Sequence, residues 1–250
     1  MKASVRLVAA QPSVMTVASW NVLHRVHAEN WDEDVLVRCP DESGRITAVT
    51  ALLKGRDEQV IALQEVSGDQ LDALRGALPG RTVHALRYPR VPAQRRGTCS
   101  LREPGEHLVL LVDGPSRQIA AESFEDDSGK GALAVETDGM LVVATHVSGD
   151  QRRTGQLARL AELAATPAGC PAVLLGDFNT GRATVVSVLG PGFAVVDLPP
   201  GALPTRPHTS GSASQWIDHV VVRGAGVSSA AVESTDGLSD HNLIRARLTV

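Results

Sequence analysis

Apolar residues occur along most of the chain in short runs of strand length, which are separated by glycine, proline and aspartate. Residues 60–63 are four consecutive apolar residues, a pattern typical of a strand that is buried on both faces. The dipeptide Asp138-Gly139, between two further runs, predicts a tight hairpin. The pattern as a whole predicts strands over residues 14–20, 60–63, 82–86, 107–112, 118–124, 131–137, 140–146, 171–176, 216–223, 227–233 and 242–250.

Helical spacing of apolar residues appears between these runs. The clearest case is residues 151–166, where Leu157, Leu160 and Ala164 fall on one face. The polar stretch over residues 30–42 predicts a loop, and residues 1–13 read as a loose N-terminal extension. Further helices are predicted over residues 43–55, over the segment that contains Leu71, Leu74 and Leu78, and through Val188.

Strands and helices are mixed in both halves of the sequence, without an internal repeat or a recognisable linker. A chain of 250 residues is long enough to bury a sizeable core in a single domain. We therefore expect an α/β (α+β) fold with one domain over residues 14–250.

Composition narrows the class of protein. The three cysteines, Cys39, Cys99 and Cys170, stand at unrelated spacings without a C-x-x-C pair, which argues against a zinc ribbon, a redox pair or a disulfide framework. Apolar runs all fall short of the ~20 residues of a membrane span. Arg6 interrupts the apolar start of the chain, so a secretory signal is not indicated and a cytoplasmic protein is expected.

Charge is distributed unevenly. Between Arg81 and Arg102 the sequence holds six arginines and no acidic residue, although the formal net charge of the chain is -4. This segment predicts a loop that faces phosphate, with Arg95 and Arg96 as substrate contacts; a solvated loop explains the same residues equally well. The net charge disfavours a tight binder of double-stranded DNA. Aromatic residues make up only 3%, too few for a platform that stacks a whole single strand.

Short polar clusters follow several of the apolar runs. Each cluster by itself is ordinary, because a carboxylate after a strand is usually a turn residue or a helix cap. Taken together, they supply carboxylates, imidazoles and carboxamides at the same place in the topology. Such an inventory suits a hard cation, Mg²⁺ or Mn²⁺, and phosphoryl chemistry. The clusters are Asn21, Gln64-Glu65, Thr145-His146, Gly176 to Asn179, Asp218 and Ser239 to His241.

The order SWN, LQEV, TH, GDFN, ID and SDH, distributed from Trp20 to His241, resembles the endonuclease/exonuclease/phosphatase superfamily of DNase-I-like hydrolases. The resemblance implies a four-layer αββα sandwich of two packed mixed β-sheets. It also implies a hydrolase of ester bonds that depends on Mg²⁺ or Mn²⁺.

The resemblance assigns roles residue by residue. Asp177 would orient or deprotonate the attacking water, and Asn179 would donate to the phosphoryl oxygens. His241 would stand against the scissile phosphate, oriented by Asp218, with His146 as a second phosphate contact. His219, next to Asp218, points to the opposite face of its strand and reads as structural. The implied metal side consists of Asn21, Glu65 and Asp240.

These roles predict hydrolysis of a phosphodiester bond in a nucleic acid or nucleotide by in-line attack of an activated water. A phosphatase of a small phosphorylated metabolite, such as an inositol phosphate or lipid headgroup, is the alternative. A second alternative is a catalytically inactive binding module of the same fold. The only tyrosine, Tyr88, lies far from the TH motif, which weakens an abasic-site endonuclease. Lys130 is either a substrate contact or a solvated lysine.

Overall fold

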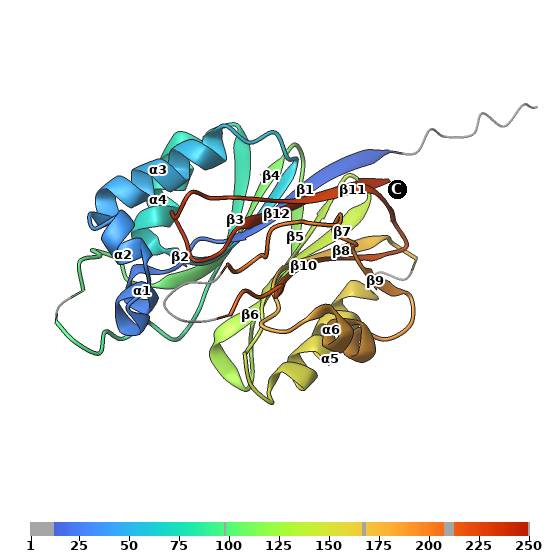
Figure 1. Cartoon of the computed structure of the whole chain (residues 1–250). Coiled ribbons are helices and arrows are strands. Elements are labelled where there is room, and N and C mark those ends of the chain that lie inside the picture. Colours follow the sequence, from blue (N-terminus) through green and yellow to red (C-terminus); the bar gives the residue numbers. More distant parts are fainter. Residues whose placement is uncertain (1–12, 98, 167–168, 208–212, 250) are drawn as a thin grey trace, which may run out of the picture.

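Twelve strands form two six-stranded mixed sheets in the computed structural model, which describes residues 13–97, 99–166, 169–207 and 213–249 (Figure 1). In the first sheet the strand order is β11-β12-β1-β2-β4-β3. These strands are β1 (Val14–Asn21), β2 (Val60–Ser67), β3 (Arg81–Arg87), β4 (Glu106–Asp113), β11 (Gly226–Glu233) and β12 (Leu243–Thr249). In the second sheet the order is β5-β6-β7-β8-β10-β9. Its strands are β5 (Arg117–Phe124), β6 (Asp127–Thr137), β7 (Met140–His146), β8 (Ala172–Asp177), β9 (Phe193–Val195) and β10 (Asp218–Arg223).

A parallel strand pair lies at the centre of each sheet. β1 runs parallel to β2 in the first sheet, and β7 runs parallel to β8 in the second, whereas all other pairs between these strands are antiparallel. The carboxyl ends of parallel neighbours lie at the same edge of a sheet. The ends of these strands therefore lie at one edge of each sheet, and a hydrogen bond from Asn21 Nδ2 to Asp177 Oδ2 joins the two edges.

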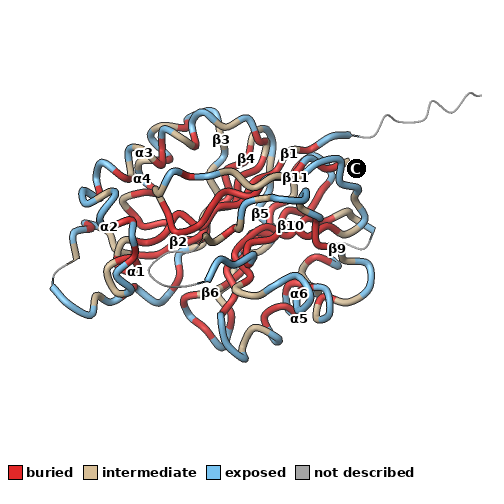
Figure 2. Tube along the Cα trace, in the orientation of Figure 1, coloured by how far each residue is buried: buried red, intermediate tan, exposed pale blue. Residues whose placement is uncertain are grey.

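The main core lies between the two sheets. It is built from the inward faces of both sheets, with fully buried residues such as Val17, Leu110, Leu133 and Val220. Burial on this scale stabilises the fold by roughly 1.5–3 kcal/mol for each large aliphatic side chain. Figure 2 shows the buried central strands between exposed outer segments.

Helices cover the outer face of each sheet, which confirms the predicted four-layer arrangement (Figure 1). On the first sheet, Val49 of α3 (Glu42–Lys54) and Leu74 of α4 (Gly68–Ala77) pack with Trp20. On the second sheet, α5 (Arg153–Ala164) and α6 (Arg182–Leu189) pack in the same way through Leu160 and Val185.

The structure differs from the sequence prediction in the segment after β1. Helix α1 (Arg25–Trp31) was not predicted, and α2 (Val35–Arg38) lies inside the stretch expected to be a loop. The sequence of α1 shows no apolar stripe, and only Val26 and Ala28 of this helix are buried. The helix instead begins at His24, whose Nδ1 accepts a hydrogen bond from the Val26 N–H. The three-residue strand β9 was also too short to predict.

The start of β1 at Val14 agrees with the sequence, but residues 1–12 of the predicted N-terminal extension lie outside the described residues. The assignment of residues 14–250 to a single domain stays a prediction. Among the described residues, the helices lack the length and apolar character that a membrane crossing requires.

Candidate active site

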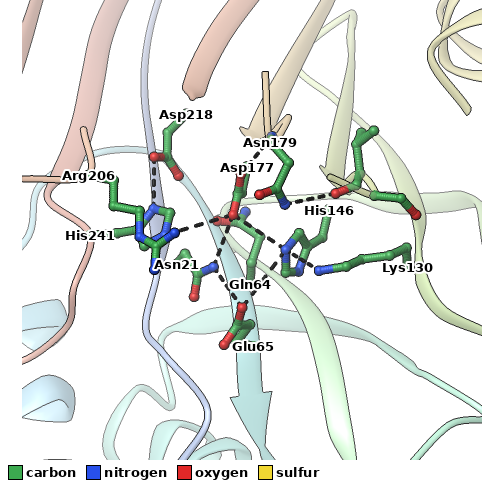
Figure 3. Close-up of polar contacts among 12 residues, drawn as sticks. Asn21, Gln64, Glu65, Lys130, His146, Asp177, Asn179, Arg206, Asp218 and His241 are labelled. Carbon is green, nitrogen blue, oxygen red and sulfur yellow. Dashed lines mark hydrogen bonds and ion pairs between the residues drawn. The ribbon is translucent and has the colours of Figure 1, made fainter. Parts of the chain in front are cut away.

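Seven predicted site residues come together at the edge of the sandwich where the central strands end, beside a cavity of about 550 Å³. Figure 3 shows most of their side chains pointing toward one another. We call these seven the floor of the cavity: Asn21, Glu65, His146, Asp177, Asn179, Asp218 and His241. Five of the seven line the cavity, whereas Asn21 and Asp218 lie behind them and hydrogen-bond to Glu65, Asp177 and His241. Asp240, Lys130 and Arg95 line the cavity too, and Arg96 is not among the described residues that line it.

A bulge in β2 aims Glu65 into the cavity. The pairing of β2 with β4 shifts register between Leu63 and Val66, so Gln64 and Glu65 lie in an irregular stretch of the strand. Glu65 has a φ of 59°, in the left-handed region that non-glycine residues rarely adopt. Such a conformation costs of order 1–3 kcal/mol and is found preferentially at functional sites. Pairing with β4 resumes at Val66, so the strand continues to Ser67, beyond the end predicted at Leu63.

Close approach of two strands explains the glycine before Asp177. A Cβ on Gly176 would lie 2.0 Å from the Thr145 carbonyl oxygen, so any larger residue would push β7 and β8 apart. The following turn is fixed by Asp177, whose Oδ1 accepts a hydrogen bond from the Asn179 N–H at 2.8 Å. Asn179, with a φ of 48°, donates from Nδ2 to the Val147 carbonyl. This leaves the second N–H of its carboxamide for another acceptor.

Asn21 joins the two sheets at the floor. Its Nδ2 donates to Glu65 Oε1 at 3.0 Å and to Asp177 Oδ2 at 3.2 Å. Its Oδ1 accepts a hydrogen bond from the Leu23 N–H. A carboxylate from each sheet is therefore held by a single carboxamide, which reduces the repulsion between them.

Basic side chains lie against the carboxylates of the floor. His146 Nε2 lies 3.4 Å from Asp177 Oδ2 and 3.9 Å from Glu65 Oε1, and it contacts Lys130 Nζ. Burial raises the pKa of Asp177, but His146, His241 and Lys130 outweigh it and bring that pKa well below its usual range. Burial likewise opposes His27, His146 and Lys130 at Glu65, whose pKa is also lowered. Both carboxylates are therefore ionised at neutral pH.

His241 and Asp218 form a buried hydrogen-bonded pair, with His241 Nδ1 2.9 Å from Asp218 Oδ2. Burial lowers the pKa of His241, but Asp218 and Asp240 outweigh it and raise this pKa to about 10. The ring is therefore an imidazolium at neutral pH. Trp20 anchors this segment, because its Nε1 donates to the His241 carbonyl at 3.0 Å.

Asp240 lies against an arginine that the sequence did not single out. Arg206 Nε donates to Asp240 Oδ2 at 3.0 Å, and Arg206 Nη2 donates to Glu33 Oε1 at 3.1 Å. All three side chains line the cavity. The sequence contains no motif around Arg206, and its partner Glu33 is distant in the chain.

A second histidine–carboxylate pair, which the sequence reasoning also missed, lies on the α1 side of the cavity. His27 Nε2 is 3.0 Å from Glu106 Oε2, and Glu106 is fully buried at the start of β4. Burial lowers the pKa of His27, but Glu65 and Glu106 outweigh it and raise that pKa. The only signal in the sequence was the spacing of His24 and His27 in the segment that follows Asn21.

Arg45 fixes the connection between β1 and α1. Its guanidinium is buried, pairs with Glu42, and donates to the carbonyls of Val22 and Leu23. These bonds satisfy a stretch of backbone in which Leu23 has a φ of 58°. Arg45, on α3, therefore helps to hold α1 in its position over the cavity.

Two sets of donors could hold a divalent cation. Glu65 presents a carboxylate to the cavity beside Asn21. Asp177, Asp218 and His241 each have one possible ligand atom, and these atoms lie within 4.8 Å of one another, but His241 would bind a cation only as a neutral ring. Asp218 Oδ1 is buried without a hydrogen-bond partner among the described residues. This chemistry, dominated by carboxylate oxygens, fits a hard cation such as Mg²⁺ or Mn²⁺.

Comparison with known proteins agrees with this geometry. The family model described as "Endonuclease/Exonuclease/phosphatase family" matches residues 18–241. No curated protein matches the sequence.

Solved structures show the same fold. D. rerio TDP2 in complex with a single-strand DNA product has a TM-score of 0.68 at 16% identity, with 95% of this chain and 100% of that chain covered. ANGEL2, a 2′,3′-cyclic phosphatase in complex with adenosine-2′,3′-vanadate, has a TM-score of 0.68 at 17% identity and 96% coverage of both chains. The endonuclease/exonuclease/phosphatase from Bacteroides vulgatus has a TM-score of 0.66 at 18% identity, covering 94% and 98%.

Proposed function

The chain belongs to the endonuclease/exonuclease/phosphatase family of phosphoester hydrolases, and on this premise we propose that it hydrolyses a phosphodiester bond in a nucleic acid or nucleotide. The observation that carries the proposal is the floor: ionised carboxylates and a buried imidazolium surround one cavity. Such a set of charges is expensive to bury and is typical of a site that stabilises a charged transition state.

The cavity has room for a phosphoryl group between groups of opposite charge. Asp177 accepts the proton of the attacking water, since its carboxylate is held ionised by the cations around it. The water oxygen attacks phosphorus in line with the leaving oxygen, whose bond to phosphorus breaks as the new bond forms. His241, His146 and the free N–H of Asn179 donate to the phosphoryl oxygens as their negative charge grows.

Glu65 and Asn21 would hold a divalent cation, Mg²⁺ or Mn²⁺, at the cavity. When bound, the cation neutralises charge on the phosphoryl oxygens. For Asp240 we propose another role than the metal-side role that the family resemblance implies. Its carboxylate fixes Arg206 at the cavity wall, where the guanidinium adds positive potential for an anionic substrate.

Two observations favour nucleic acids and nucleotides over a small phosphorylated metabolite. The TDP2 structure contains a DNA product and the ANGEL2 structure a nucleoside vanadate, so relatives of this fold accept such ligands. In this chain, Arg90 and Arg95 line the cavity, and we propose that they contact the flanking phosphates of a longer substrate.

A substrate panel tests the proposal. We expect purified protein to hydrolyse at least one member of a set of single- and double-stranded DNA, RNA, 2′,5′-linked oligomers and mononucleotides. Mg²⁺ or Mn²⁺ should support turnover, and EDTA should abolish it. Activity on inositol phosphates alone would favour the metabolite phosphatase. Undiminished activity in EDTA would contradict the mechanism.

A further inference from the structure

The residues of α1 that face the cavity follow helical spacing. His27, Asn30 and Trp31 stand at positions i, i+3 and i+4, and all three line the cavity. Together with Arg90, Val91 and Arg95, which line the same cavity, we call them the rim of the cavity. None of the six belongs to the motifs that suggested the family.

Trp31 and Arg95 contact each other at the rim. The Arg95 guanidinium carbon lies 4.6 Å from the centre of the Trp31 ring, which is a cation–π stack. The Trp31 residue nevertheless remains 61% exposed. Trp20, by contrast, is fully buried in the core. An indole left open to water beside a catalytic cavity forgoes the free energy that its burial would give.

Hydrogen bonds hold this surface in place before any ligand arrives. Asn30 Nδ2 donates to the Ala93 carbonyl at 3.0 Å, and Asn30 Oδ1 accepts from the Arg95 N–H at 2.8 Å. Gln94 Nε2 donates to Glu29 Oε2 of the same helix. The loop is therefore fastened to α1 at three successive residues, which lowers the ordering cost of binding.

We propose that Trp31 and Arg95 form a subsite that stacks one nucleobase of the substrate next to the scissile phosphate. The inference rests on the proposed function and narrows it to substrates that carry a base. Aromatic side chains and guanidinium planes are the groups on which proteins stack unpaired bases. The subsite contains one aromatic ring and so offers a stacking face to a single base, in agreement with the low aromatic content of the chain.

The surroundings of the subsite favour a nucleotide over other planar or phosphorylated ligands. Lys130, Arg206 and His241 line the same cavity and supply positive charge for a phosphate. Val91 is 46% exposed at the rim and adds apolar surface to the same cavity. A cyclitol phosphate would satisfy the cations, but it has no planar face to set against Trp31.

The test compares substrates with and without a base. One is thymidylyl-3′,5′-thymidine, and the others are its two analogues in which one or the other nucleoside is replaced by a base-free tetrahydrofuran unit. We expect the wild-type protein to have a lower KM for the dinucleotide than for at least one analogue. Trp31→Ala should raise the dinucleotide KM roughly five- to a hundredfold and change kcat less, while KM for that analogue stays unchanged. Trp31→Phe should retain most of the preference.

Trp216 provides a matched control, since it is 48% exposed but is not among the described residues that line the cavity. Trp216→Ala should keep the wild-type KM ratio. A Trp31→Ala protein that keeps this ratio too would overturn the subsite. An equal loss on methyl p-tolyl phosphate, which carries an aryl group and no base, would assign the surface to an aryl leaving group and overturn the nucleobase.

Fluorescence separates failure of the subsite from failure of the proposed function. In EDTA, where no turnover is expected, thymidine monophosphate should quench tryptophan emission of the wild type and of Trp216→Ala. The quenching should be absent in Trp31→Ala. Quenching without turnover of any substrate would remove the proposed function and keep the base subsite. Turnover without Trp31-dependent quenching would keep the proposed function and overturn the base subsite.

Discussion

The floor and the rim of the cavity are built in opposite ways. Floor residues such as Asp177, Asp218 and His241 are almost fully buried, and they stand at or next to the ends of hydrogen-bonded strands. The rim comes from a seven-residue helix and a loop, and its aromatic residue Trp31 is mostly exposed. A buried strand end holds a side chain rigidly in a medium of low dielectric constant, where charge is most effective in catalysis. A helix surface and a loop are better suited to selecting what binds.

This division predicts that floor variants change kcat and rim variants change KM. Asp177→Asn should have the largest effect, since it removes the proton acceptor and keeps the size of the side chain. We expect kcat to fall at least about 100-fold, with KM within a few-fold of wild type.

Steady-state kinetics on the best panel substrate measure the effect of Asp177→Asn, and thermal unfolding checks the fold. Asp197→Asn is a suitable control, because Asp197 is exposed and pairs with Arg182 on the surface. A wild-type kcat in Asp177→Asn would show that the proton has another acceptor.

Asp218→Asn should act on the same step through pH. In the wild type, His241 is protonated below its pKa of about 10, so activity should persist well above neutral pH. Loss of the neighbouring anion stabilises the neutral ring and lowers that pKa. The alkaline limb of the kcat profile should therefore move to lower pH in the variant, with a smaller loss near pH 6. An unmoved alkaline limb would exclude His241 as the group that titrates there.

Cation binding offers a measurement on the floor that does not need turnover. Mg²⁺ or Mn²⁺ bound to the folded state alone raises the free energy of unfolding, by about 2.7 kcal/mol at a hundred times the Kd. We expect the wild-type melting temperature to rise with cation concentration and Glu65→Gln to lose most of this rise. Glu103→Gln, outside the cavity, should keep it. An equal rise in Glu65→Gln would move the cation to the Asp177, Asp218 and His241 set.

The contrast between floor and rim also marks how far the sequence could be interpreted. Floor residues follow apolar runs, so the strand ends could be located and their side chains expected at one edge. The helix α1 escaped prediction because its position depends on Arg45, whose guanidinium donates to carbonyls 22, 23 and 193 residues away. Arg206 likewise donates a hydrogen bond to Glu33, which is 173 residues away in the sequence, and no local sequence pattern predicts such a pair.

Even on the floor, the sequence could not supply the local geometry. The strand expected to end at Leu63 continues to Ser67, because a bulge absorbs Gln64 and Glu65 and turns the carboxylate inward. A register shift of this kind depends on the pairing with β4 and not on residue type alone. Asp240, which lines the cavity next to the floor residue His241, shows the same limit, since only the folded chain brings it to its partner Arg206.

The smallest expected effect separates two neighbours at the rim. Arg95 stacks on Trp31 and lines the cavity, whereas Arg96 is exposed beside it. On a dinucleotide, Arg95→Ala should raise KM about two- to fivefold, the size of an exposed cation–π contact, and Arg96→Ala should raise it less. On long single-stranded substrates both variants should weaken binding and reduce its salt dependence, since each removes a positive charge from the segment that we expect to face phosphate. Equal KM values for the two variants on the dinucleotide would mean that Arg95 acts only through its charge, and the stack with Trp31 would then contribute nothing to selection.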